Sequence, residues 1–499
     1  MEDAAVADEP TQYEIAVIGS GPGGYVAAIR AAQLGFKTLL IEKEPQPGGT
    51  CLHCGCIPTK AMLHAAEILE EARAASRFGV MTSEVRLDLP AMHRYKDSVV
   101  QKNAKGVEFL LKKNGVETLR GFGRLAGGGM VDIMPGNGAA ARRIAARHVV
   151  LATGSEVRGL PGVEIDGRAI ITSDEALHLQ GVPASMIVLG AGAVGVEFAS
   201  IYSRFGSRVT LLEMLPRVLP LEDEEVSSEL ERVFRKRDIT IHTGARVEKV
   251  VRRDTAVEVK ARQGEKALAL SAEVVLVAVG RKPRTEGIGL EGTGVDLDKG
   301  FVKVDGMMRT GEPGVYAIGD IVPTPPLAHV ASHEGILAVE HIKGLPVHPI
   351  DYDQIPACTY CQPEVASIGL TEAEARRRGY EVRIGKFPFA ALGKAAILGA
   401  SEGFTKIVSE ARYDQILGVH MIGPHVTDLI SEAVAALRLE GTVEELFHAI
   451  HPHPTLSEVM GEAAMASHGR PIHIFAEAAR AAGRRAEAVE GAGGTKGPP

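Results

Sequence analysis

Two cysteines, Cys51 and Cys56, lie close together in the segment GGTCLHCGCIPTK, with four residues between them. Sulfurs at this spacing along a helical turn can close a small disulfide that is easily reduced and formed again. A structural disulfide in a small secreted domain normally joins distant segments, because closing a long loop gains most. The short-loop pair in this long chain therefore indicates redox chemistry. If the pair is considered alone, the alternative interpretation is that both cysteines are small, buried apolar residues.

The residues on either side of the pair are suited to contact with a bound ring. Gly48 and Gly49 let the backbone approach a ligand closely, and Pro58 constrains the turn. Lys60 adds a positive charge next to the sulfurs. The flanking residues thus support a reactive disulfide rather than a buried one.

The other three cysteines are harder to interpret. Cys54 is either a spectator thiol or a partner in a bridge with Cys51 or Cys56, and the strict geometry of short disulfide loops favours the spectator. Cys358 and Cys361 form a CxxC pair in another part of the chain. Without a second pair or nearby histidines this is a poor zinc site, so we expect a buried pair on a strand.

A glycine-rich turn precedes the cysteines by about thirty residues. Gly19, Gly21 and Gly24 form GxGxxG between an apolar run and a helical segment. The first glycine permits the turn, the second lets the backbone meet a pyrophosphate, and the third packs helix on strand. The helix N-terminus supplies N–H groups and the positive end of a dipole. Glu42, eighteen residues after Gly24, suits a pair of ribose hydroxyls.

The same arrangement recurs later in the chain. Gly190, Gly192 and Gly195 form a second loop, and Glu213 follows the last of them by eighteen residues. A carboxylate at this place accepts bonds from a free 2′-hydroxyl and repels a 2′-phosphate, which favours NAD over NADP. Arg217 is either a solvated surface charge, which we favour, or a contact for that phosphate.

The surrounding chain alternates short β-rich runs with helical periods, which predicts an α/β protein. The unit of strand, glycine turn, helix and strand occurs twice, so it is a repeated fold unit rather than a solenoid. From about Asp351 the composition changes, and beyond about Phe475 we expect a frayed helix and a disordered tail. The expected strands are 13–19, 37–44, 148–155, 272–283 and 314–320, the second unit is 186–215, and the expected helices are 25–35, 60–76 and 91–114.

The bulk properties exclude several classes of protein. A chain of 499 residues predicts about three domains, and 45% hydrophobic with 24% charged residues is ordinary for a soluble protein. The net charge of −8 and the lack of a basic block argue against nucleic acid as a partner. The acidic N-terminus MEDAAVADEPTQ predicts neither a secretory signal nor a transit peptide.

One apolar stretch, residues 184–202, is long enough to suggest a membrane span. Its three glycines at nucleotide-loop spacing and the ionisable Glu197 instead favour a buried strand, turn and helix. We therefore expect a cytoplasmic protein without a membrane partner.

Two dinucleotide loops and a redox pair together imply a path for electrons. A nicotinamide would deliver or receive hydride, a flavin would relay it, and the disulfide would take or give two electrons. The first loop would bind FAD, because the cysteines follow it directly. Asp320, at the end of GVYAIGD, fits a flavin contact on a strand that returns to the same sheet; its alternative is a strand-terminal cap.

In this order the motifs resemble the flavoprotein disulfide reductases, the class I pyridine nucleotide-disulfide oxidoreductases, and within them the dihydrolipoyl dehydrogenases. The resemblance runs from about Tyr13 to about Ile474 and rests on GSGPGG, GGTCLHCGCIPTK, VVLATGS, GAGAVGVE with LLE, VAVGRKPRT, YAIGD and HPHPTLSE. It implies an α/β fold with two Rossmann-like dinucleotide-binding domains and a C-terminal α+β dimerisation domain. The implied domains are an FAD-binding domain (1–158), an NAD-binding domain (159–281), an FAD-domain return segment (282–350) and an interface domain (351–474), followed by a tail (475–499).

The resemblance also implies roles around the disulfide. Cys51 would exchange with the substrate dithiol, and Cys56 would meet the flavin and form a charge-transfer thiolate. Lys60 would lie near the flavin N5 edge, paired with Glu197. Such a pairing explains an acid within an apolar segment, because a buried charge needs a partner.

A histidine at HPHPTLSE completes the implied site. His453 resembles the family's acid/base, and Glu458 would hold its ring in the right tautomer. In the family this pair reaches the cysteines from the other subunit of a homodimer. His451 is a competing candidate, but Glu458 stands five residues after His453, as in the family's pattern, and this spacing favours His453. Without the family, His453 would equally be interpreted as a turn histidine beside a proline.

Further cofactor contacts follow from the same resemblance. Ala328 falls where the family's backbone approaches the flavin pyrimidine. The other implied FAD contacts are Gly49, Thr50, Thr153, Gly154, Gly319 and Asp320, and Gly280 is an implied NAD contact.

The activity that the resemblance implies is NAD-dependent oxidation of protein-bound dihydrolipoamide. The partner would be the lipoyl-bearing acyltransferase core of a 2-oxoacid dehydrogenase complex, or a glycine-cleavage carrier protein. Among rival enzymes, a glutathione-type reductase would have basic residues in place of Glu213, and a mercuric reductase would have a cysteine pair in the tail. A flavoprotein that serves only as a scaffold is the rival of another class, and the complete set of implied catalytic residues speaks against it.

Overall fold

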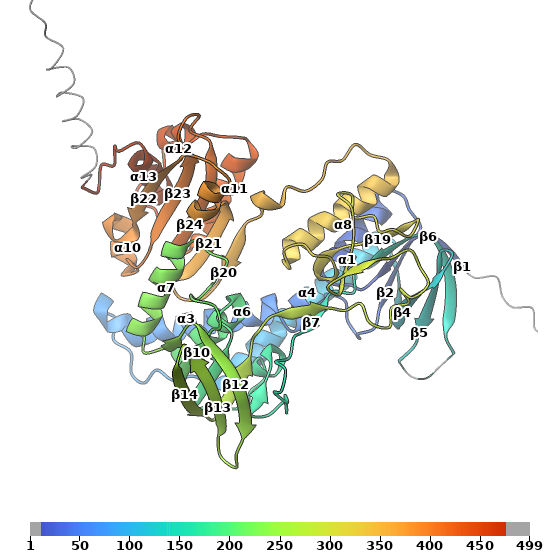
Figure 1. The fold of residues 1–499 in the computed structure, drawn as a ribbon, viewed down its shortest axis with the longest axis horizontal. Coiled ribbons are helices and arrows are strands. Elements are labelled where there is room, and N and C mark those ends of the chain that lie inside the picture. Colours follow the sequence, from blue (N-terminus) through green and yellow to red (C-terminus); the bar gives the residue numbers. More distant parts are fainter. Residues whose placement is uncertain (1–10, 137, 139, 476–499) are drawn as a thin grey trace, which may run out of the picture.

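The first glycine turn belongs to a mixed sheet of seven strands (Figure 1). The computed structural model describes residues 11–136, 138 and 140–475, so the predicted tail beyond residue 475 lies outside the described residues. Strands with apolar runs such as TLLIE are parallel and covered on both faces, as such runs predict. The parallel strands are, in spatial order, β3 (Glu117–Arg120), β2 (Thr38–Glu42), β1 (Thr11–Ile18), β6 (Arg142–Leu151) and β19 (Val315–Ala317).

The same edge of β6 that pairs with β19 also pairs, in its N-terminal part, with β5 (Met130–Met134), and β5 pairs with β4 (Phe122–Gly127), both antiparallel. Because β19 pairs with the C-terminal part of β6, the segment GVYAIGD returns to the first sheet as the sequence predicts. The turn after β1 and the turn after β19 therefore open at the same end of the sheet. This geometry brings two distant segments to one site.

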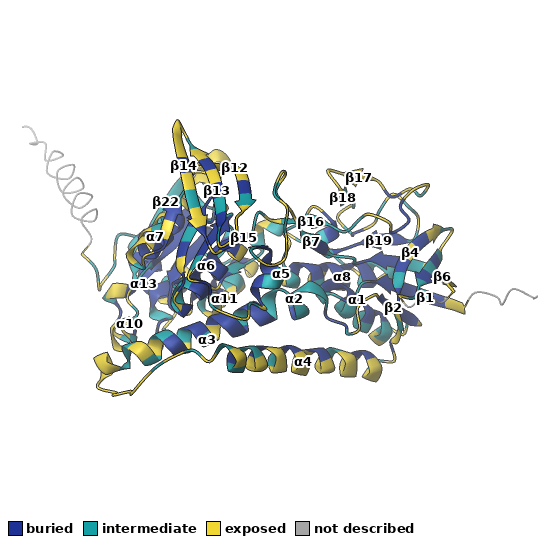
Figure 2. Ribbon diagram, turned by 90° about the horizontal axis from the view of Figure 1, so that it is seen from below, coloured by how far each residue is buried: buried dark blue, intermediate teal, exposed yellow. Residues whose placement is uncertain are grey.

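The helices around this sheet position the cysteines. α1 packs closely on α8, where a Cβ on Gly335 would lie 2.7 Å from the carbonyl oxygen of Gly23. α3 also packs against α6 (Ala193–Phe205), which follows the second glycine turn, and Figure 2 shows α3 and α4 along one long side of the molecule. These helices are α1 (Pro22–Gln33), α2 (Gly49–His53), α3 (Cys56–Ala74), η1 (Ala75–Phe78), α4 (Leu89–Lys113) and α8 (Ala328–Lys343).

The second glycine turn belongs to a parallel sheet of five strands, so the predicted repetition of the fold unit is confirmed. Within residues 11–136, 138 and 140–475, no helix combines the length and apolar character that a membrane crossing needs. The strands are β11 (Thr240–His242), β10 (Arg208–Leu212), β9 (Ser185–Leu189), β15 (Val274–Val277) and β8 (Ile170–Ile171), with helices α5 (Ser173–Ala176), α6 (Ala193–Phe205) and α7 (Glu224–Lys236) and an antiparallel sheet of β12 (Ala245–Arg252), β13 (Val257–Gln263) and β14 (Lys266–Ala272).

The C-terminal part is an antiparallel sheet with helices, which completes the predicted fold class. Its strands lie in the order β20 (Ala357–Thr359), β21 (Glu364–Gly369), β24 (Ile416–Gly423), β23 (Phe404–Glu410) and β22 (Val382–Pro388). α11 packs on β21 and β24, and α13 packs on β22 and β23. The helices are α9 (Glu372–Arg377), α10 (Gly393–Leu398), α11 (Val426–Arg438), α12 (Val443–His448) and α13 (Glu458–Ser467), with η4 (Phe389–Ala391).

Short elements connect the three parts. β7 (Ser155–Val157) pairs antiparallel with β16 (Arg281–Pro283), where the chain leaves the first sheet and later returns to it. The other short elements are β17 (Leu297–Asp298), β18 (Phe301–Val302), η2 (Gly319–Ile321) and η3 (Tyr352–Gln354). Of the domain limits implied by the resemblance, those after residues 158 and 281 fall next to this ribbon, and all of the limits remain a prediction.

An ion cluster around the buried Lys406 joins the C-terminal sheet to α7. Lys406 Nζ lies 3.1 Å from Asp223 Oδ1, 2.8 Å from Glu225 Oε1 and 2.8 Å from Glu372 Oε2. Burial acts to lower the pKa of Lys406, but the surrounding carboxylates raise it above its ordinary value. Only 2% of the Lys406 side chain and 3% of the Asp223 side chain are exposed, so each charge depends on the other.

Candidate active site

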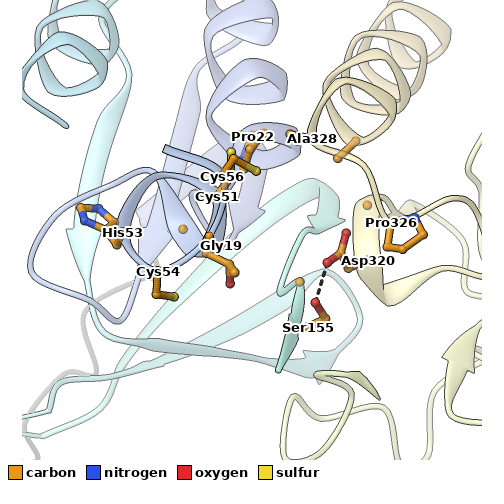
Figure 3. Close-up of a pocket in the computed structure, with 18 of the residues that line it drawn as sticks. Gly19, Pro22, Cys51, His53, Cys54, Cys56, Ser155, Asp320, Pro326 and Ala328 are labelled. Atoms are coloured by element: carbon orange, nitrogen blue, oxygen red, sulfur yellow. Dashed lines mark hydrogen bonds between the residues drawn. The ribbon is translucent and has the colours of Figure 1, made fainter. Parts of the chain in front are cut away.

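A cavity of about 1240 Å³ extends between the three parts of the molecule. Figure 3 shows some of the residues that line it. The first glycine turn lines it, and so do the cysteine segment, the start of α6 and residues of the C-terminal part. Ligand cavities commonly measure about 300–1,000 Å³, so this one has room for a dinucleotide-sized group.

The first glycine turn has the shape that a dinucleotide needs. Gly19 has a φ of +103°, which favours glycine, and a Cβ on Gly24 would lie only 1.9 Å from the Gly19 carbonyl oxygen. A Cβ on Gly21 would meet nothing within 4 Å. Gly24 therefore serves the packing of α1 on the turn, whereas Gly21 faces open space through which a ligand can approach the backbone.

The second turn repeats this geometry. A Cβ on Gly195 would lie 1.9 Å from the Gly190 carbonyl oxygen, and one on Gly192 would again meet nothing within 4 Å. The start of α6 that follows this turn lines the large cavity through Val194 and Glu197. Helix α6 therefore begins at the second glycine turn and contacts the same cavity that the first glycine turn lines.

The two acids that follow these turns are held alike. Glu42 accepts hydrogen bonds from the backbone N–H groups of Ser20 and Glu44, each at 2.9 Å. Glu213 accepts corresponding bonds from Ala191 N at 2.6 Å and Leu215 N at 2.8 Å. Each carboxylate therefore lies against its own glycine turn.

Arg217, the alternative phosphate contact, is engaged elsewhere. Its Nη1 donates to Glu224 Oε1 at 2.5 Å, and a third of the Arg217 side chain is exposed. This geometry agrees with the surface charge that the sequence favours.

The further residues that the resemblance implies for FAD all line the cavity: Gly49, Thr50, Thr153, Gly154, Gly319, Asp320 and Ala328. Ser155 donates to Asp320 Oδ2 at 2.5 Å, a contact drawn in Figure 3. Arg281 in turn donates from Nε to Ser155 Oγ at 2.7 Å. Gly280, with a φ of +107°, directly precedes this arginine. Sequence reasoning missed Ser155 and Arg281, because their contacts form only when β7 pairs with β16.

A buried glutamate also supports the turn after β19. Glu334 has no exposed surface, and its Oε2 accepts from Gly319 N at 2.6 Å. Its Oε1 accepts from the Tyr352 hydroxyl at 2.8 Å. Burial raises the pKa of Glu334. This glutamate was missed as well, since an acid within a helical segment gives no signal of its buried position.

Cys51 and Cys56 lie together in the cavity as free thiols (Figure 3). Cys51 belongs to α2, and Cys56 is the first residue of α3, where helix N-terminal N–H groups favour a thiolate. The hydrogen bond from Cys51 lowers the pKa of Cys56 to about 7, and the charge of Lys60 adds to this effect. The same hydrogen bond, together with burial, raises the pKa of Cys51. Cys56 is therefore the thiol that ionises first.

An ion pair stands one helical turn after Cys56. Lys60 Nζ donates to both carboxylate oxygens of Glu197 at 2.8 Å. Glu197 is 6% exposed, whereas a third of the Lys60 side chain is exposed. The structure thus supplies the buried acid in α6 with a cationic partner from α3.

His453 and Glu458 form a pair away from this cavity. His453 Nδ1 lies 2.8 Å from Glu458 Oε1, and Glu458 Oε2 accepts from Thr455 N at 2.8 Å. Partial burial acts to raise the pKa of Glu458, but these hydrogen bonds lower it. The His453 side chain is 76% exposed, and neither residue lines the cavity of the cysteines. One chain therefore does not bring His453 to its own dithiol.

The competing histidine is already engaged. His451 Nε2 lies 2.8 Å from Glu432 Oε1, and the His451 side chain is 11% exposed. The bond to this carboxylate raises the pKa of His451. Of the two histidines, only His453 presents its ring to the outside.

The remaining cysteines differ in part from expectation. Cys54 lines the cavity, and Figure 3 shows it apart from Cys51 and Cys56; burial raises its pKa. The expected buried strand pair is wrong for Cys358, which lies in the edge strand β20 but is only half-buried and lines the cavity. Cys361 is buried but lies beyond the strand. The pair separates because the chain leaves the sheet after Thr359.

Two protein-family models match this chain, one over the two parts with glycine turns and one over the C-terminal part. The family described as "Pyridine nucleotide-disulphide oxidoreductase" matches residues 13–335, and its "dimerisation domain" matches residues 355–464. The chain belongs to this family. The family's cofactors are FAD and NAD, and the two glycine turns and their acids fit them.

Several relatives of this oxidoreductase family match nearly the whole chain. The dihydrolipoyl dehydrogenase of Bacillus subtilis is 48% identical and covers 93% of this chain and 100% of its own. That of Thermus scotoductus is 45% identical, covering 93% and 99%. Among solved structures, LpdA from Mycobacterium tuberculosis superposes with a TM-score of 0.84 at 28% identity, covering 91% of this chain and 99% of its own.

Proposed function

We propose that this chain is a dihydrolipoyl dehydrogenase, which oxidises protein-bound dihydrolipoamide to lipoamide and reduces NAD to NADH. The observation that carries the proposal is the pair Cys51 and Cys56, with its unequal acidities, in the cavity that begins at the first dinucleotide turn. The relatives named above support the choice of substrate.

The residues of the first turn would hold FAD. Gly19, Gly21 and Gly24 would receive its pyrophosphate, and Glu42 its adenosine ribose, while Asp320 and Ala328 would contact the flavin part. When bound, FAD supplies a two-electron relay between the cysteines and the nicotinamide. Gly190, Gly192, Gly195, Gly280 and Glu213 would hold NAD, whose free 2′-hydroxyl suits the carboxylate.

The dithiol chemistry begins with the Cys51–Cys56 disulfide. A thiolate of dihydrolipoamide attacks the Cys51 sulfur, the S–S bond breaks, and Cys56 leaves as a thiolate. The second lipoyl thiolate then attacks the first lipoyl sulfur, which releases cyclic lipoamide and leaves Cys51 reduced. Two electrons have passed to the enzyme. Cys56 is suited to leave because its pKa is the lower of the two.

Protons in these steps require a base next to Cys51. His453 of the partner subunit would accept the proton of each lipoyl thiol before attack and return one to Cys51. Glu458 fixes the tautomer through its bond to Nδ1, so that Nε2 remains the reacting nitrogen. Lys60, paired with Glu197, keeps positive charge beside the Cys56 thiolate.

This arrangement makes the homodimer the working form, because each site takes cysteines from one chain and a histidine from the other. The matching dimerisation domain supports this assembly. The proposed partner is the lipoyl-bearing acyltransferase core of a 2-oxoacid dehydrogenase complex or a glycine-cleavage carrier protein. We further propose a cytoplasmic location. The proposed domain limits are 1–158, 159–281, 282–350 and 351–474.

Steady-state turnover tests the proposal. The purified protein should reduce NAD with dihydrolipoamide, prefer lipoylated carrier domains to free lipoamide, and use NAD far better than NADP. With NADH it should reduce lipoamide but neither glutathione disulfide nor mercuric ion. Inert lipoamide would overturn the proposed substrate. A Cys56→Ser protein with wild-type lipoamide activity would overturn the redox mechanism.

A further inference from the structure

Tyr360 is the point at which the C-terminal part contacts the ion pair beside the dithiol. After β20 ends, Tyr360 N donates to Glu197 Oε1 at 2.9 Å. Two residues later, Gln362 N donates to Ser200 Oγ at 3.2 Å. Glu197 and Ser200 are three residues apart in α6 and therefore lie on one face of it. The segment from Tyr360 to Gln362 thus docks along α6 by backbone hydrogen bonds.

The ring of Tyr360 contacts the other member of the pair. Lys60 Nζ lies 4.7 Å from the ring centre, within the range of a cation–π interaction. The residue is 37% exposed and lines the cavity. Its hydroxyl makes no hydrogen bond among the described residues. The contact with Lys60 is made by the face of the ring. Burial raises the pKa of Tyr360 to about 12, which keeps the phenol neutral at physiological pH.

We propose that Tyr360 is a positioning residue that holds both members of the Lys60–Glu197 pair beside Cys56. Its backbone N–H fixes the carboxylate, and its ring fixes the ammonium group. This inference deepens the proposed function and rests on it. Without the ring, the partly exposed Lys60 side chain would sample water as well as Glu197.

The consequence concerns Cys56. Lys60 favours the Cys56 thiolate and Glu197 opposes it, so the balance depends on where the ammonium group stands. Cys51 also faces Cys56, and its hydrogen bond lowers the pKa of Cys56 further. Because Tyr360 belongs to the C-terminal part, docking of this part on α6 would set the acidity of Cys56 in the same chain.

Two substitutions separate the ring from the backbone contact. Tyr360→Leu removes the ring but keeps the N–H that Glu197 accepts, whereas Tyr360→Phe keeps both. The matched control is Tyr413→Leu. Tyr413 also donates its N–H to a glutamate, Glu410, and its ring also lies 4.7 Å from a cation, the guanidinium of Arg412, but it does not line the cavity.

The measurement is a pH titration of the thiolate charge-transfer absorbance in the reduced, FAD-loaded dimer, with dithionite as reductant. We expect Tyr360→Leu to lower the ionisation constant of Cys56 about three- to tenfold, as loss of a fixed neighbouring charge predicts. Tyr360→Phe and Tyr413→Leu should stay within about twofold of wild type. FAD content and dimer mass identify folded protein, and Tyr360→Met replaces the leucine variant if that one does not fold.

A double substitution tests whether Tyr360 acts through Lys60. In a Lys60→Met background, Tyr360→Leu should change the ionisation constant no further. The inference is overturned if Tyr360→Leu titrates like wild type, or if its effect persists in the Lys60→Met background. The titration needs no lipoamide, so inert lipoamide would count against the proposed function alone, and an unshifted titration against Tyr360 alone.

Discussion

Two alanine substitutions in the second dinucleotide turn should separate packing from nucleotide binding. In Gly195→Ala the new Cβ would lie 1.9 Å from the Gly190 carbonyl oxygen, about 1.5 Å closer than the 3.4 Å at which ordinary contact begins. Gly190 is itself closely packed against backbone, because a Cβ on it would lie 2.4 Å from the Ala278 carbonyl oxygen. Overpacking of this kind costs about 1–3 kcal/mol, and we expect a value near 3 kcal/mol.

Gly192→Ala should have the opposite pattern. A Cβ there meets nothing within 4 Å, and the extended backbone, at φ −73° and ψ −177°, is allowed for alanine. The free energy of unfolding should therefore change by less than about 0.5 kcal/mol. The methyl group would stand where the pyrophosphate of NAD must approach, so NADH affinity should fall at least about tenfold, or ~1.4 kcal/mol.

The assays are urea unfolding of the FAD-loaded enzyme and titration of NADH binding. Gly181→Ala is the control, because its Cβ also meets nothing within 4 Å and the residue lies outside the turn; both properties should stay at wild-type values. Wild-type NADH affinity in Gly192→Ala would refute the identification of this open space as the nucleotide path. Wild-type stability in Gly195→Ala would refute the packing argument.

Four further results are expected. Lys406→Met should lower the free energy of unfolding by roughly 3 kcal/mol, because it leaves a buried carboxylate without its cation; an unchanged urea midpoint would contradict this. Because the pKa of Cys56 is lowered to about 7, its thiolate persists above that pH and is protonated below it, so charge-transfer absorbance should fall by half near pH 7; constant absorbance from pH 5 to 9 would count against it. Cys54→Ser should keep lipoamide turnover within about twofold of wild type, since Cys54 lies apart from the pair; loss of turnover would assign it a redox role. Equal amounts of Cys51→Ser and His453→Gln subunits, dissociated and reassociated, should recover about a quarter of wild-type turnover, because half of the dimers carry one complete site; no recovery would show that the histidine does not act across the dimer.

Local patterns in the sequence predicted most of the elements that carry the site. The two glycine turns, the acids that follow them and the cysteine pair are each contained in a short segment, where strand, turn and helix signals are strong. The return of GVYAIGD to the first sheet followed from its apolar strand and terminal Asp320. The predicted burial of Cys358 was wrong, because the four-residue CxxC motif does not indicate that its strand lies at the edge of the sheet and ends at Thr359.

The sequence by itself determined which chemistry the chain can do, because a five-position cysteine spacing and two dinucleotide turns are local properties. The family resemblance already implied different roles for the two sulfurs and a Lys60–Glu197 pair, whereas only the tertiary structure decided the contacts that make their acidities unequal and the contact of Tyr360 with that pair. Cys56 is the more acidic thiol because Cys51 donates to it and Lys60 stands one turn away, and Lys60 is held by Glu197 and Tyr360 from two other parts of the fold. Such contacts depend on burial and distance between remote segments, and no periodicity along the chain encodes them.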